Sequence, residues 1–176
     1  MMRSLTWVFA VLLPASAVAQ TAQMAQDSPP VVSLRDGRAS AALPSSEGAQ
    51  LVARKIKERT GSQGDITVEF VRIVRFTEQP RCGRVGYTLY QKSSNTAWGQ
   101  FGGQLNVCED GGPPLRLCKG SAVLVPANAQ CTDGSWPAET PEVQAAMARA
   151  AADGSLTGEQ FRARFGARPK KGEAKK

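Results

Sequence analysis

Two runs in the middle of the chain alternate apolar residues and glycines with polar residues. The first run covers residues 83–89 and the second covers residues 99–107, with the polar segment 92–96 between them. Strict alternation is typical of a strand that buries one face, and a short polar segment between two such runs is typical of a hairpin loop. The pattern therefore predicts an antiparallel hairpin with one apolar face.

The register of this hairpin follows from its apolar positions. The register that matches them places Val85 opposite Leu105, Leu89 opposite Phe101, and the Tyr87 ring over Gly103. A bulge at the glycines of the second strand would shift this register. We therefore expect one continuous register unless a glycine interrupts it.

The same register bears on the cysteines, which are Cys82, Cys108, Cys118 and Cys131. It places Cys82 opposite Cys108 and so predicts a disulfide between them, and a disulfide between Cys118 and Cys131 follows by elimination. No Cys-x-x-Cys spacing occurs in the sequence, which disfavours a zinc site and a redox-active pair. We expect two structural disulfides.

Three aromatic residues fall outside the predicted apolar face. In this register Tyr90 faces Gln100 and Trp98 faces Lys92, all on the second face of the hairpin, and Trp136 lies in a loop. Either a helix covers the second face, or these aromatic side chains form a patch that binds a partner. Tyr90, Trp98 and Trp136 are therefore the candidate partner-binding residues.

Further strand patterns lie on both sides of the hairpin. Residues 65–77 alternate, and the parity changes near Val71, which predicts a bulge or a strand buried on both faces. Residues 109–114 predict an exposed turn, and 115–119 and 121–125 predict two short strands or one broken strand.

Helical patterns flank the strands. An amphipathic helix is expected to begin at residues 45–47 and to end at Gly61. A second helix begins at residues 140–142, where proline takes the first helical position, and ends at 153–154. A last short helix would carry Phe161 and Phe165.

The predicted fold class is α+β. A meander of four to five antiparallel strands follows one amphipathic helix and precedes a short helical hairpin. We expect a signal peptide at 1–19, a flexible leader at 20–44, a single disulfide-stapled domain at 45–166, and a disordered basic tail at 167–176.

The expectation of export rests on the N-terminus. Arg3 precedes an apolar run at residues 5–15, and Ala17-Val18-Ala19 fits the small-x-small pattern of signal peptidase, with cleavage before Gln20. The run is too short to cross a hydrocarbon core of about 30 Å, which disfavours a membrane anchor. We expect a periplasmic or secreted protein without a transmembrane segment in the mature chain.

The positive charge of the chain is concentrated at its end. The whole chain has 22 Lys and Arg against 15 Asp and Glu. The basic residues of the last segment are Arg162, Arg164, Arg168, Lys170, Lys171, Lys175 and Lys176. Such a cluster can bind an anionic polymer or lipid surface, or it can serve only as a solvated terminus.

The chain contains no histidine. This excludes Ser-His and Cys-His nucleophile pairs, metal or haem ligation by histidine, and imidazole base catalysis within this chain. We expect no cofactor and no metal. The favoured function is an exported non-enzymatic binding or accessory protein of the bacterial periplasm or cell surface, whose partner is an envelope or extracellular protein. The alternatives are an exported hydrolase that uses carboxylates, and a polyanion-binding module that acts through the tail.

Overall fold

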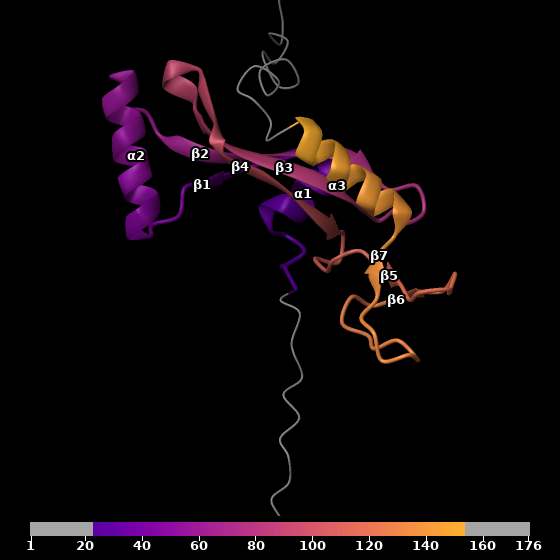
Figure 1. Ribbon diagram of the computed structural model, residues 1–176. Coiled ribbons are helices and arrows are strands. Elements are labelled where there is room, and N and C mark those ends of the chain that lie inside the picture. Colours follow the sequence, from indigo (N-terminus) through magenta and orange to yellow (C-terminus); the bar gives the residue numbers. More distant parts are fainter. Residues whose placement is uncertain (1–22, 154–176) are drawn as a thin grey trace, which may run out of the picture.

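The computed structural model describes residues 23–153, which form two antiparallel sheets and the helices around them (Figure 1). The larger sheet has the strand order β1-β2-β3-β4 and the smaller has the order β6-β5-β7. The elements in chain order are α1 (Pro29–Asp36), β1 (Arg38–Ala42), α2 (Glu47–Thr60), β2 (Ile66–Arg75), β3 (Cys82–Gln91), the 3-10 turn η1 (Lys92–Ser94), β4 (Thr96–Cys108), β5 (Arg116–Leu117), β6 (Leu124–Val125), β7 (Ala138–Glu139) and α3 (Pro141–Asp153).

The α+β class, the antiparallel meander and both disulfides are confirmed. The amphipathic helix α2 precedes β2-β3-β4, and α3 follows the strands. Cys82 is bonded to Cys108 and Cys118 to Cys131. The expected last helix with Phe161 and Phe165 lies outside the described residues, as do the signal peptide and the basic tail. None of the helices between residues 23 and 153 has the length and apolar content that a membrane span requires.

The flexible leader at 20–44 was a wrong prediction for most of its length, because α1 and β1 lie within it. Pro29 and Pro30 occupy the first helical positions, and Gly37, with φ of 94°, ends the helix. Val31 and Leu34 are fully buried, and β1 pairs with β2 along its whole length. The Ala, Ser and Pro content hid a helix that needs only two apolar residues to dock.

Helices cover both faces of the larger sheet. On one face α1 packs Val31 and Leu34 against Val85 and Val107. On the other face α3 packs Val143 against the Cys82–Cys108 disulfide. The two contact positions on β3, Cys82 and Val85, differ in parity, and side chains of opposite parity point to opposite faces. Figure 1 accordingly shows α1 and α3 on opposite sides of the sheet.

The predicted register holds for only one half of the hairpin. Cys82 pairs with Cys108, Val85 with Leu105 and Tyr87 with Gly103, as expected. Beyond Tyr87 the register shifts, so that Leu89 pairs with Trp98 and Tyr90 with Ala97.

The shift is a bulge in β4 at residues 99–102, and glycine permits it. A Cβ atom at Gly102 would collide with the carbonyl oxygen of Tyr87. A Cβ at Gly103 would lie 2.7 Å from the Tyr87 hydroxyl, which agrees with the expected cover of this glycine by the ring. The bulge leaves Phe101, placed in the core by the sequence pattern, 44% exposed. A second irregularity, between Arg72 and Val74 of β2, confirms the expected change of parity.

The smaller sheet and its loops form a separate lobe at residues 113–139, here called the disulfide lobe. The Cys118–Cys131 bond closes its longest loops. An ion pair of 2.6 Å joins Arg116 of β5 to Glu139 of β7. The Gln79 side chain connects the lobe to the larger sheet, because its amide donates to the Leu115 carbonyl oxygen and accepts from the Leu115 N–H, at 3.1 and 2.7 Å.

Candidate functional site

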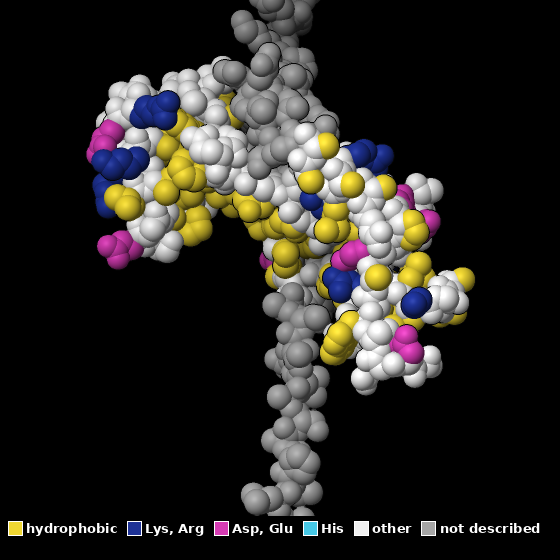
Figure 2. Space-filling view, viewed as in Figure 1, with side chains coloured by type: hydrophobic (Ala, Val, Ile, Leu, Met, Phe, Trp, Pro, Cys, Tyr) yellow, Lys and Arg dark blue, Asp and Glu magenta, His cyan; other side chains and the backbone are white. Residues whose placement is uncertain are grey.

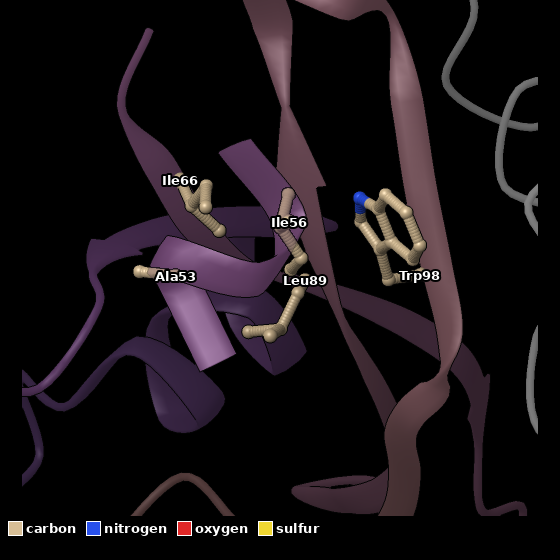
Figure 3. Packing of buried hydrophobic residues seen from close by; sticks show 5 residues of the cluster. All are labelled: Ala53, Ile56, Ile66, Leu89 and Trp98. Atoms are coloured by element: carbon tan, nitrogen blue, oxygen red, sulfur yellow. The ribbon is translucent and has the colours of Figure 1, made fainter. Parts of the chain in front are cut away.

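The structure separates the three candidate aromatic residues. Trp98 is only 7% exposed and belongs to the core beneath α2, where it contacts Ile56 and Leu89 (Figure 3). The Arg59 guanidinium of α2 lies 5.4 Å from the centre of its ring. The sequence placed Trp98 on the second face of the hairpin, either under a helix or in a binding patch. The β4 bulge instead moves Trp98 to the opposite face, which α2 covers. Trp98 is not a surface-binding residue.

Tyr90 remains on the second face. It is half-buried and packs with Val71 and Ala97. Its hydroxyl donates to the Asn95 side-chain oxygen at 2.9 Å. The ring is thus held both by apolar neighbours and by its polar tip, which fixes its position at the end of β3.

Tyr90 borders a polar hollow of about 630 Å³ at the ends of β1, β2 and β3. Its lining residues are Ser40, Asp65, Thr67, Glu69, Tyr90, Lys92 and Ser93, and together they are here called the polar hollow. A second hollow of about 360 Å³ at the edge of β1 shares Ser40, Asp65 and Thr67 with it. The two hollows therefore adjoin each other at β1 and the start of β2.

The Glu69 carboxylate of the polar hollow accepts two hydrogen bonds from neighbouring strand residues. Its Oε1 atom accepts hydrogen bonds from the hydroxyls of Ser40, at 2.6 Å, and Thr67, at 2.7 Å. These bonds hold the Oε1 atom in place, and no hydrogen bond to Oε2 is present among the described residues. Sequence reasoning missed this site because Ser40 fell in the supposed leader; the signal was the polar positions 67 and 69 on one strand parity.

The third aromatic residue, Trp136, lies on the disulfide lobe and is 70% exposed. Val123 on the same lobe is 68% exposed. Val123 immediately precedes β6 and Trp136 lies two residues before β7, and both strands pair with Leu117 of β5. The two residues therefore lie at the same end of the small sheet. Figure 2 shows apolar side chains at the surface of this lobe.

Two carboxylates outside the polar hollow, those of Glu109 and Glu142, accept hydrogen bonds that join neighbouring segments. The hydrogen bond from Arg75, at 2.8 Å, lowers the pKa of Glu109. Burial alone would raise the pKa of Glu142, but hydrogen bonds from the Thr77 and Glu78 N–H groups lower it. A general acid of a glycosidase needs the opposite shift. Within residues 23–153 no three Cys, Asp or Glu side chains gather as metal ligands.

The candidate polyanion-binding residues, Arg162 to Lys176, lie outside the described residues. In the described part, basic side chains gather on α2, at the left of Figure 2. They are Arg54, Lys55, Lys57 and Arg59. The described residues therefore include a local group of basic side chains on one helix. Lys55 is partly neutralised by Glu58, at 3.0 Å.

Comparisons with protein-family models, with curated proteins and with solved structures found no match to this chain. The site is therefore assigned from its own geometry.

Proposed function

We propose that this protein is an exported, non-enzymatic binding protein of the bacterial periplasm or cell surface, and that it captures a protein partner through the disulfide lobe. The single observation that supports this is the 70% exposure of Trp136 on the disulfide lobe. Tryptophan is strongly enriched among the residues that dominate binding energy at protein interfaces. An indole held in water on a cross-linked lobe is a preorganised anchor for such an interface.

Two further features agree with this function. The paired cysteines fit an oxidising compartment, because disulfides are rare in the cytosol. The disulfide and the Arg116–Glu139 ion pair hold the lobe without a large core. The lobe can therefore present Trp136 and Val123 outward without loss of its own structure.

The test is site-specific cross-linking with the exported protein in its native host. A photoreactive residue at position 136 should trap a discrete envelope protein, and the same residue at Leu51, an exposed position on α2, should not. With the partner purified, Trp136→Ala should weaken binding at least 10-fold, whereas Met147→Ala, an exposed apolar control on α3, should have no effect. Equal trapping at both positions, or equal affinity of Trp136→Ala, would contradict the proposal.

A second candidate function is polyanion binding through the basic tail. It is favoured by the run of seven basic residues from Arg162 to Lys176 against the single acid Glu173. Truncation after Phe165 should abolish binding to heparin at low salt. If the truncated protein still binds, Lys57→Ala with Arg54→Ala tests whether α2 is the surface responsible.

A further inference from the structure

The polar hollow carries an inference that is independent of the disulfide lobe. It lies at the ends of β1, β2 and β3, whereas Trp136 belongs to the separate small sheet. Its volume of about 630 Å³ falls within the usual range for small-ligand sites, about 300–1,000 Å³. The polar hollow therefore shares no residue with the disulfide lobe.

The chemistry of the lining residues indicates the class of ligand. Carboxylates of Asp65 and Glu69 supply acceptors, and the ammonium group of Lys92 supplies donors. A purely cationic ligand would meet the ammonium group of Lys92, and a polyanion would meet both carboxylates. A neutral ligand with many hydroxyl groups can use donors and acceptors together.

Glu69 and Tyr90 are preorganised for such a ligand. The hydroxyls of Ser40 and Thr67 both bind Oε1 of Glu69, so the carboxylate pays little orientation entropy when Oε2 accepts a further hydroxyl. The Tyr90 ring is fixed by Val71, Ala97 and Asn95. A rigid aromatic side chain offers apolar area to the C–H groups of a sugar ring while polar neighbours bind its hydroxyls.

We propose that the polar hollow binds a neutral saccharide, with Glu69 accepting from its hydroxyls and Tyr90 contacting its ring. The adjoining hollow shares Ser40, Asp65 and Thr67, so a ligand longer than one sugar ring can continue into it. The ligand is therefore an oligosaccharide chain and not a single monosaccharide.

The experiment is calorimetric titration of the purified exported protein with soluble neutral tetrasaccharides: cellotetraose, maltotetraose and N-acetylchitotetraose. Spermidine and a heparin tetrasaccharide are the cationic and anionic comparisons. At least one neutral probe should bind, and Glu69→Gln should weaken it at least 10-fold. Glu78→Gln, a matched change of a glutamate outside the polar hollow, should leave the affinity unchanged.

Two further variants keep the test decisive if Glu69→Gln does not fold. Asp65→Asn and Lys92→Ala change exposed lining residues and should each weaken binding 3-fold or more. The proposal would be overturned if none of the neutral probes binds, or if spermidine or heparin binds more strongly than they do. It would also be overturned if Glu69→Gln binds with unchanged affinity or, where that variant does not fold, if Asp65→Asn and Lys92→Ala both do. The titration contains no protein partner, so a negative result would not bear on the proposed function of the disulfide lobe.

Discussion

The larger sheet and the disulfide lobe hold their structures by different means. In the sheet, Val85 and Val107 are at most 1% exposed, and helices pack on both faces. In the lobe, each strand has two residues, and order comes from Cys118–Cys131, from Arg116–Glu139 and from the Gln79 clamp on Leu115. Apolar burial stabilises the first region, and covalent and polar bonds stabilise the second.

This difference agrees with the place of the most exposed large apolar side chains among the described residues, Trp136 and Val123, which lie on the lobe. A residue of the sheet that turned outward would remove buried area that the fold needs, at about 25 cal/mol for each Å². A residue of the lobe contributes little buried apolar area to the fold. Trp98 and Trp136 illustrate the contrast, since the first is 7% exposed within the sheet and the second is 70% exposed on the lobe.

The largest expected effect tests this contrast with one type of substitution in two places. Leu34→Ala should lower the free energy of unfolding by about 2–5 kcal/mol, because Leu34 is fully buried between α1 and the sheet. Leu115→Ala in the lobe should lower the free energy of unfolding by less than about 1 kcal/mol, because that side chain is 39% exposed. The two hydrogen bonds with the Gln79 side chain use only the backbone atoms of Leu115 and should survive the substitution. Urea unfolding measures both.

If Leu34→Ala costs as little as Leu115→Ala, then α1 does not dock as described. The expected flexible leader would then be correct in solution.

The sequence predicted the sheet better than its edges. Alternation at 83–89 and a matched pair of cysteines were sufficient to predict the register of the hairpin half near Cys82. In that half the apolar positions of both strands fall on one face, and only one register aligns them. The prediction was wrong for the half near Trp98 because β4 contains a bulge there. Gly99 and Gly102 permit the bulge, but no pattern of apolar and polar residues indicates it. The polar hollow joins Ser40 to Glu69 across β1 and β2, and such a contact between distant segments leaves no local pattern.

The second effect concerns the two disulfides. Cys82→Ser with Cys108→Ser should lower global stability by about 2–4 kcal/mol, since the bond spans β3 and β4 within the core. Cys118→Ser with Cys131→Ser should leave the unfolding midpoint of the sheet nearly unchanged and should increase amide hydrogen exchange only at residues 113–139. Hydrogen exchange read by mass spectrometry separates the two outcomes. Loss of protection throughout the sheet in the second variant would show that the two regions unfold as one unit.

The smallest effect lies at the junction of the two regions. Glu142 of α3 accepts hydrogen bonds from the N–H groups of Thr77 and Glu78, at 2.6 and 3.0 Å, and so anchors the segment that also carries Gln79. Its lowered pKa means that the charged form is favoured in the folded state. This stability is therefore present above the ordinary carboxyl pKa of 4.5 and is lost as the pH falls through the lower folded value.

Glu142→Gln should cost about 1 kcal/mol or less at pH 7, because solvent screens a partly exposed group. The difference between the two proteins in urea unfolding should shrink as the pH falls below 4.5, whereas Glu58→Gln on α2 should show no comparable loss at pH 7. A difference of equal size at pH 7 and below pH 4.5 would mean that the carboxylate charge does not hold this junction.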